Sequence, residues 1–358
     1  MVYFSIFFVL ILLCILNIVK NDNRELQFAT IPMALALILM AGLRFETGAD
    51  YGSYKAIYDI TANEFKPTYG EPLFAILNYL IGATVNSFNA LFFVIALFSV
   101  TIKFYCFKRY SKYMFVSIIL YFVTNYLSQD FGQIRQGFAI AICFLSLKYL
   151  YEGEKRLFYV LVVFATLFHF SAVIFLLALY TDKFKFSWAK MLVIWSICFL
   201  LSTMLSVLSS YVVLLDIASK GNVLGDKLGY IGDDTYGVKV PINLGMFFKM
   251  MILYLATTFR DKFGQDDKYI SRFINLYFIG GCVYFLFSFA EIYAGRLSVY
   301  FIFFELILIP YIIYCCKETV FKLLFFGVFL LYASYLLYQQ LYVIKGNFLL
   351  PYKYIIGF

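Results

Sequence analysis

One histidine and three arginines are the residues of this chain whose types and positions suggest chemistry. His169 is the only histidine and lies inside the apolar stretch 167–172. A titratable ring is costly to place at membrane depth, so a ring found there needs a reason. Arg44, Arg135 and Arg296 lie at the ends of other apolar stretches. If all four side chains lie at one face of a membrane, they form a cationic site with one base, which suits chemistry on a diphosphate.

His169 has two interpretations on sequence alone. It could be a buried histidine bonded to a backbone carbonyl or a tyrosine. It could also be a general base or proton shuttle, because an imidazole that titrates near neutral pH often has this role in catalysis. The second interpretation makes His169 the group that activates a hydroxyl nucleophile.

Each arginine also has a structural and a functional interpretation. Arg44 precedes Asp50 in a glycine-containing segment, where the two could simply pair; otherwise the Arg44 fork matches phosphate oxygens and Asp50 orients it or accepts a proton. Arg135 lies in a short polar segment that leads into a helix, and the start of a helix favours a bound anion. The alternative is that Arg135 forms a salt bridge with Asp130. Arg296 could likewise pair with Glu291.

The sequence does not call for a metal or another cofactor. Asp233 and Asp234 could together hold a divalent ion, but a glycine-flanked aspartate pair is more typical of a turn. Seven cysteines show no spacing typical of a metal site or of a disulfide framework. Because three arginines can neutralise a diphosphate, we expect a metal-independent site.

Composition sets the fold class. The chain has 358 residues, of which 63% are hydrophobic and 14% charged. Apolar runs of about 18 residues or more recur along it, each long enough to cross a bilayer. This predicts an all-α polytopic membrane protein. The net charge of +8 does not indicate nucleic acid, because lysines and arginines cluster in short segments between spans, as the positive-inside rule predicts.

We expect about ten full spans in a single integral membrane domain, 1–358, plus short re-entrant or partial helices. The predicted spans are 2–19, 28–45, 89–107, 113–128, 137–151, 189–213, 242–259, 273–290, 297–315 and 323–343. Two apolar segments are shorter or ambiguous: 72–86, and 157–181, which could be one span or two half-helices meeting at His169. If the basic clusters between spans are kept in the cytoplasm, neither of these two segments crosses the membrane fully. Both ends of the chain then lie outside. The outer face then collects the loops 44–71, 128–136 and 214–241 and the turn 291–296.

At this point the order of the motifs resembles the EpsG/Wzy family of polysaccharide polymerases, over roughly residues 40–310. The resemblance is carried by residues in five places: Arg44 with Gly48, Asp50 and Tyr54; Glu71 with Pro72; 134–139; 169–171; and Glu291 to Arg296 with Tyr300.

The resemblance implies a membrane glycosyltransferase with a GT-C-like helical fold. Such an enzyme joins undecaprenyl-diphosphate-linked oligosaccharides at the periplasmic face of the bacterial inner membrane, making O-antigen or a related surface polysaccharide. A chain-length regulator similar to Wzz is an expected partner, beside the lipid bilayer. By this resemblance His169, Arg135, Arg296 and Asp50 are catalytic. Substrate binding is assigned to Arg44, Tyr54, Glu71, Gln136, Ser171, Glu291 and Tyr300.

Three other functions stay open. A lipid-linked oligosaccharide flippase would also need cations, but along a path through the membrane and with two equivalent halves, which this sequence does not show. An O-antigen ligase would perform sister chemistry on a different acceptor. A membrane acyltransferase also uses a buried histidine, but it does not call for three outer-face arginines.

Overall fold

The computed structural model describes most of the chain. The described residues are 1–21, 24, 26–63, 71–216, 239–240, 243–260, 269–344 and 346–355. They are helical throughout, apart from turns and one isolated antiparallel bridge between Arg44 and Tyr354. The expected pair Asp233 and Asp234 lies outside the described residues, as does nearly all of the loop 214–241. The prediction of an all-helical protein is therefore confirmed for the part that the structure describes.

Several of these helices can cross a membrane, so the chain is a multi-pass membrane protein. Four are long and apolar enough in the described ranges: α1 (Val2–Lys20), α5 (Phe88–Tyr110), the first 19 residues of α9 (Trp188–Asp216), and α15 (Thr319–Tyr338) with its π-helical extension η5 (Gln339–Ile344). The pair α13 (Glu291–Ile302) and α14 (Glu305–Tyr314) is long and apolar enough only when taken together, and it bends by 45° at its break, as a broken span or a re-entrant loop does. The count of about ten stays a prediction.

The other predicted spans also coincide with helices, but shorter or less apolar ones. These are α2 (Gln27–Gly42), α6 (Met114–Tyr121) with the π-helix η1 (Phe122–Asp130), α7 (Ile134–Glu152), α11 (Leu244–Phe259) and α12 (Ile270–Leu286). The partial segments appear as α4 (Pro72–Thr84), α8 (Lys155–Phe168) and the 3-10 helix η2 (Phe170–Tyr180). The expected break at His169 is confirmed, because α8 ends directly before it and η2 begins directly after it.

Three segments expected as loops or turns are partly helical. Residues 44–71 contain α3 (Tyr51–Thr61), whose buried residues recur on one helical face. Residues 128–136 are shorter as a loop than expected, because η1 continues to Asp130 and α7 begins at Ile134. Residues 291–296 form the start of α13.

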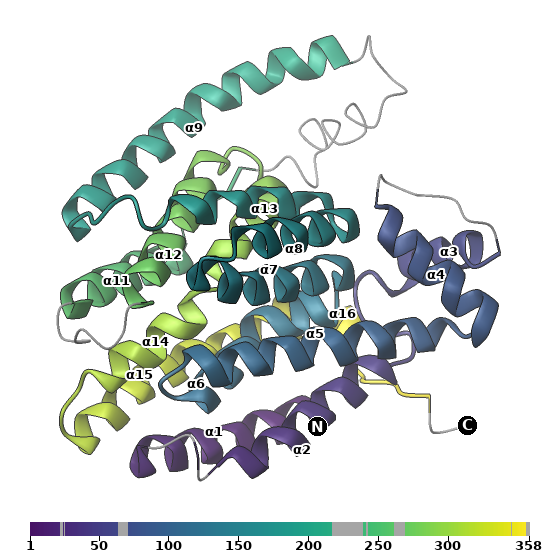
Figure 1. The fold of residues 1–358 in the computed structure, drawn as a ribbon, viewed down its shortest axis with the longest axis horizontal. Coiled ribbons are helices and arrows are strands. Elements are labelled where there is room, and N and C mark those ends of the chain that lie inside the picture. Colours follow the sequence, from purple (N-terminus) through teal and green to yellow (C-terminus); the bar gives the residue numbers. More distant parts are fainter. Residues whose placement is uncertain are drawn as a thin grey trace. The chain divides into compact units, whose positions relative to one another are not determined.

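The chain forms two compact units, residues 1–173 with 309–358, and residues 174–308. In the first unit, α7 packs between α5 and α8 (Figure 1). All eight residues of α6 are buried, so this helix is enclosed by protein on every side. The helix α4 packs on α5 and α8, and α3 packs on α4. These contacts bring the starts of α3, α4 and α7 into one region of the unit.

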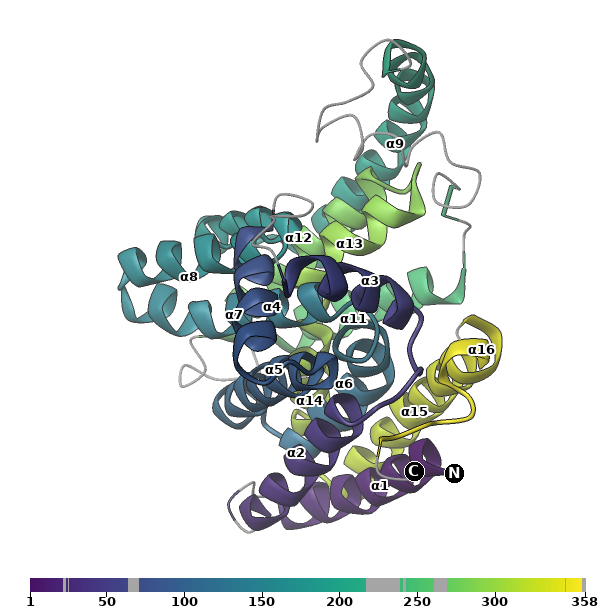
Figure 2. The ribbon, with the colours of Figure 1, turned by 90° about the vertical axis from the view of Figure 1, so that its right-hand side faces the viewer.

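The C-terminal segment 348–355 also belongs to the first unit and returns to the end of α2, as the yellow trace in Figure 2 shows. The Phe45 N–H donates to the Lys353 carbonyl at 3.0 Å, and the Gly48 N–H donates to the Phe348 carbonyl at 2.8 Å. Tyr3 of α1 donates its hydroxyl to the Leu349 carbonyl at 2.9 Å. The segment that carries Arg44 is thus held from the other end of the chain.

The second unit is built around α12, which packs against α9 and α13. Two consecutive glycines of α12 allow these close approaches. A Cβ atom at Gly280 would lie 2.8 Å from the backbone nitrogen of Ile302 in α13. A Cβ atom at Gly281 would lie 2.1 Å from the ring of Trp195 in α9, and the Trp195 indole donates to the Phe278 carbonyl at 2.9 Å.

Candidate active site

Glu71 is the centre of a buried polar cluster in the first unit. It lies directly before α4, whose first residue is Pro72, and its side chain is 5% exposed. One carboxylate oxygen, Oε1, lies 2.7 Å from Nδ1 of His169. The other, Oε2, accepts a hydrogen bond from Nη1 of Arg135 in an ion pair. A single carboxylate therefore joins the predicted base to one of the predicted cations.

His169 takes part because the helix breaks at this position. Its backbone is extended, with φ −152° and ψ 114°, and its N–H still donates to the Ala165 carbonyl at 2.8 Å. Its carbonyl accepts from the Ala172 N–H at 3.0 Å as η2 begins. The ring is thus held at the junction of two helices, with Nδ1 toward the Glu71 carboxylate.

Arg135 lies in the first turn of α7, directly after the short turn 131–133. Its guanidinium carbon is 5.5 Å from the ring centroids of both Tyr54 and Phe74. Tyr54 comes from α3 and Phe74 from α4, and both are buried. Aromatic faces and the Glu71 carboxylate together fix this guanidinium. Arg135 forms its ion pair with Glu71, whereas the carboxylate of Asp130 forms an ion pair with Lys103.

Arg44 lies at the other end of the same row of side chains. Its guanidinium carbon is 4.0 Å from the Phe92 ring centroid and 4.6 Å from that of Phe131. Tyr54 meets Phe92 edge-on at 6.3 Å, so aromatic rings connect Arg44 to the Arg135 end. The row therefore reads Arg44, Phe92, Tyr54, Arg135, and then the Glu71 carboxylate with His169.

Arg44 is buried without a counter-ion among the residues that the structure describes. It is 1% exposed, and its Nη1 donates to the backbone carbonyl of Asp130 at 3.3 Å. Its Nε and Nη2 atoms have no hydrogen-bond partner in the described part of the chain. The expected pairing of Arg44 with Asp50 is not found there. Asp50 instead lies directly before α3, at its N-cap position.

The Asp130 carboxylate belongs to a second buried cluster that the sequence interpretation missed. It forms an ion pair with Lys103 of α5, at 2.5 Å, in which both side chains are almost fully buried. The Tyr121 hydroxyl donates to it at 2.7 Å, and the Ser99 hydroxyl also donates to it. Lys103 lies inside the apolar run 89–107, where one lysine among apolar residues was the available signal.

Comparison with known proteins decides the family. The EpsG family matches residues 28–354, which is nearly the whole chain. The chain belongs to the EpsG family. A curated relative is the amylovoran biosynthesis protein AmsC of Erwinia amylovora, which is 21% identical over 328 residues, covering 86% of this chain and 84% of AmsC. No solved structure matches the chain.

The matched range of this EpsG-family chain includes every residue of the row from Arg44 to His169 and almost all of the C-terminal segment that holds Arg44. The row and the neighbouring cluster of Lys103 and Asp130 together hold three buried or partly buried cations, Arg44, Lys103 and Arg135, against the two carboxylates Glu71 and Asp130. These five side chains together therefore carry an excess of one positive charge. Arg44 is the cation that lacks a carboxylate among the described residues.

The charge states of Glu71 and Arg44, which lie toward opposite ends of the row, follow from the surroundings of Glu71 and from the chemistry of the Arg44 guanidinium. Burial raises the pKa of Glu71, but the hydrogen bond and charge of His169, together with Arg135, outweigh burial and hold the pKa below its usual range. Arg44 is charged because a guanidinium stays protonated throughout the physiological pH range. Near neutral pH, Glu71 is thus an anion and Arg44 a cation.

The remaining predicted site residues lie beside the row or in the second unit. Gln136 follows Arg135 and is buried, and Ser171 follows His169 in η2. Glu291, Arg296 and Tyr300 belong to α13 of the second unit, where Tyr300 is buried and Glu291 is exposed. The structure thus brings together Glu71, His169, Arg135 and Tyr54, and it connects Arg44 to them. The roles assigned to all of these residues stay predictions.

Proposed function

We propose that this chain is a membrane glycosyltransferase that polymerises undecaprenyl-diphosphate-linked oligosaccharides into O-antigen or a related surface polysaccharide. Membership of the EpsG family supports this proposal. So does the similarity to AmsC, a protein named for the biosynthesis of amylovoran. The multi-pass helical architecture suits a substrate with a prenyl tail, because such a tail stays in the bilayer.

The observation that carries the proposal is the contact between Glu71 and His169. A carboxylate that accepts a hydrogen bond from Nδ1–H fixes the tautomer whose lone pair is on Nε2. It also stabilises the imidazolium that forms when Nε2 takes a proton. We assign to His169 the removal of the proton from the acceptor hydroxyl, and to Glu71 the orientation of the ring. This revises Glu71 from a substrate-binding residue to a positioning residue.

The leaving group needs cations. When the acceptor oxygen bonds to the anomeric carbon of the donor sugar, the bond between that carbon and the lipid diphosphate breaks, and the diphosphate gains charge. Guanidinium groups placed against it lower the barrier, because they bind this charge more strongly as it develops. Arg135 lies beside the proposed base, and Arg44 carries the excess positive charge of the cluster. Arg296 is the third proposed cation. Asp50 does not pair with Arg44 among the described residues, so we assign it the alternative role of accepting a proton.

The further parts of the proposal rest on the resemblance and on the charge pattern. Reaction at the periplasmic face of the inner membrane follows from keeping the basic clusters in the cytoplasm. A GT-C-like fold, the polyprenyl carrier and a chain-length regulator as partner follow from the polymerase assignment. We propose a metal-independent mechanism because arginines supply the positive charge that a metal ion would otherwise provide.

A cellular experiment tests the function. We would delete the gene, complement the strain with the wild-type chain, and separate its surface glycans by size. The proposal predicts that the null strain attaches a single repeat unit and that the wild-type chain restores the ladder of longer products. A null strain that attaches no repeat at all would contradict it, since the protein would then act earlier or at ligation, as a flippase or a ligase does.

A further inference from the structure

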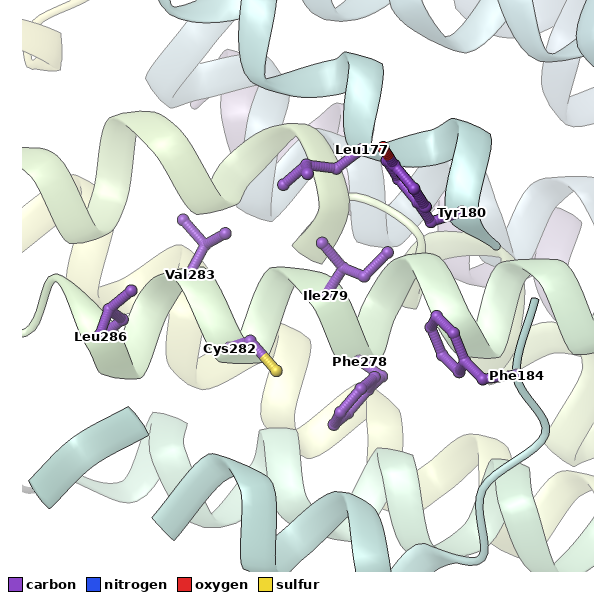
Figure 3. A pocket seen from close by; sticks show the side chains of 8 residues that line it. All are labelled: Leu177, Tyr180, Phe184, Phe278, Ile279, Cys282, Val283 and Leu286. Atoms are coloured by element: carbon purple, nitrogen blue, oxygen red, sulfur yellow. The ribbon is translucent and has the colours of Figure 1, made fainter. Parts of the chain in front are cut away.

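The second unit contains an apolar groove that the proposed reaction does not use. The groove has a volume of about 250 Å³ and no polar lining. Figure 3 shows Leu177 and Tyr180 on one side of it and residues of α12 on the other. The α12 residues form one stripe at helical spacing: Phe278, Ile279, Cys282, Val283 and Leu286. From Phe278 to Leu286 the helix rises by about 12 Å, so the groove is long enough for a segment of hydrocarbon chain.

The polar groups at the Tyr180 end of this groove are mostly engaged with one another. Asn275 of α12 donates to the carbonyls of Thr181 and Phe184, both at 2.7 Å. Asp182 forms an ion pair with Arg272. These contacts tie the segment after η2 to the first turns of α12, and they give the groove a fixed wall at this end.

Lys183 is the cation at this end that has no carboxylate partner among the described residues. Its ammonium lies 4.4 Å from the centroid of the Tyr180 ring, which itself lines the groove. A hydrocarbon groove that ends at a lysine fits an amphiphile with an anionic head. One lysine matches the single negative charge of a phosphodiester, whereas a diphosphate calls for more than one cation.

A second groove lies on the other side of a pair of stacked rings. Phe184 lines the first groove, and it stacks on Phe186 with ring centroids 5.0 Å apart. Phe186 lines the second groove, which has a volume of about 370 Å³ and includes Lys190 of α9. Two apolar grooves, one with Lys183 against its Tyr180 wall and one lined in part by Lys190, fit a lipid with two chains better than a lipid with one.

We propose that the segment 177–194 with α12 binds an anionic diacyl glycerophospholipid. One acyl chain lies along α12 in the first groove, and the phosphodiester meets Lys183. This site is independent of the proposed polymerase activity, because none of its residues belongs to the row from Arg44 to His169. On the charge pattern, Lys183 lies at the cytoplasmic leaflet, where basic sites between spans bind anionic headgroups.

The test compares two lipids with identical chains, phosphatidylglycerol and phosphatidylcholine, bound to the purified full-length protein. Native mass spectrometry gives the number of bound lipids, and a melting curve gives the rise in Tm with each lipid. We expect phosphatidylglycerol to bind about fivefold more tightly, which is the effect of about 1 kcal/mol for one cation near an anionic head. Equal binding of the two lipids would overturn the proposal.

Two variants and one control locate the site. Lys183→Gln should remove the preference for phosphatidylglycerol, and Ile279→Trp, which fills the groove, should weaken binding of both lipids. Lys155→Gln removes the same charge from the exposed first residue of α8 in the first unit, and it should change neither the preference for phosphatidylglycerol nor the binding of the two lipids. If Lys183→Gln keeps the full preference, the site is not here. If undecaprenyl phosphate displaces phosphatidylglycerol from the wild-type protein but not from Ile279→Trp, the groove binds the carrier instead, which also overturns the proposal.

Discussion

Oε1 of Glu71 lies 2.7 Å from Nδ1 of His169, although the two residues are 98 positions apart in the chain. The side chains of both residues are largely buried, with 5% of Glu71 and 15% of His169 exposed. A buried carboxylate and a buried imidazole at this distance orient each other, because each supplies the hydrogen-bond partner that the other needs. A buried polar group without such a partner would destabilise the protein. The only histidine of the chain is thus a positioned ring with one defined tautomer when neutral.

The first prediction concerns the coupling of these two residues. His169→Ala should lower the polymerisation rate by roughly 10²–10⁴-fold, because it removes the proposed general base. Glu71→Gln should lower it on the order of 10²-fold or more, because the ring loses the charge that orients it and stabilises its protonated form. The double variant should be about as slow as His169→Ala alone, because both residues act through one ring.

The measurement is the initial rate of chain growth by purified protein on lipid-linked repeat units, with Tm recorded for every variant. A double variant whose losses multiply would show that Glu71 and His169 act independently. Glu71→Asp serves as a control that keeps the charge but shortens its reach, and it should lie between Glu71→Gln and the wild type.

The second prediction concerns the buried ion pair of Lys103 and Asp130. Asp130→Asn should destabilise the protein by about 3–5 kcal/mol, because it leaves the Lys103 ammonium buried without its counter-charge. The double variant with Lys103→Met should be less destabilised than Asp130→Asn alone, because no unpaired charge remains. Denaturant unfolding in detergent micelles measures both values.

The exposed ion pair of Arg109 and Glu152 supplies the matched control for this experiment. Their side chains are 32% and 35% exposed, so Glu152→Gln should cost less than about 1 kcal/mol. Equal destabilisation by Glu152→Gln and Asp130→Asn would mean that burial of the Lys103–Asp130 pair has no energetic consequence.

The third prediction concerns the turn that carries Arg44. Gly48 has a φ of +116°, and a Cβ atom there would lie 2.8 Å from the Phe131 carbonyl oxygen. Gly48→Ala should therefore cost about 1–3 kcal/mol of stability. Gly52, in α3, has open space around it, so Gly52→Ala should be neutral or stabilising by up to about 1 kcal/mol. A melting comparison of the two variants that shows equal Tm values would contradict this account of the turn.

The fourth prediction is the pH dependence that Glu71 contributes to stability. Its pKa in the folded protein lies below the unfolded value of about 4.3, so the stabilisation is complete above that value and is lost as pH falls through the folded pKa. The difference in Tm between the wild type and Glu71→Gln should not diminish from pH 8 to pH 5, and it should shrink below about pH 4. A difference that disappears between pH 7 and pH 5 would mean that Glu71 binds a proton in the folded protein.

The helices of this chain were largely predictable because apolar runs and their interruptions are local features. The break at His169 could be predicted because one full span over 157–181 would have placed Lys183 and Lys185 outside the cell, against the positive-inside rule. The extension of η1 to Asp130 could not, because its polar residues resemble a loop in sequence, while the burial that makes them helical depends on α5 and α7. The helix α3 was missed for a similar reason, since its buried face becomes apparent only against α4.

The members of the site were easier to predict than their partners. Arg44, Arg135, Glu71 and His169 were all singled out from the sequence, but the only partners considered for the two arginines within the protein were Asp50 and Asp130. Sequence neighbours are the natural first choice for an ion pair. Here tertiary packing decides instead, because Lys103 reaches Asp130 across two helices and leaves Glu71 to bind Arg135.

The most direct test of the central claim is a glycan ladder from the deletion strain complemented, at matched protein levels, with the wild-type chain, His169→Ala or Glu71→Gln. The account predicts a full ladder with the wild type, a single repeat unit with His169→Ala, and a strongly shortened ladder with Glu71→Gln. Full ladders from both variants would contradict the proposed active site, even though the chain belongs to the EpsG family.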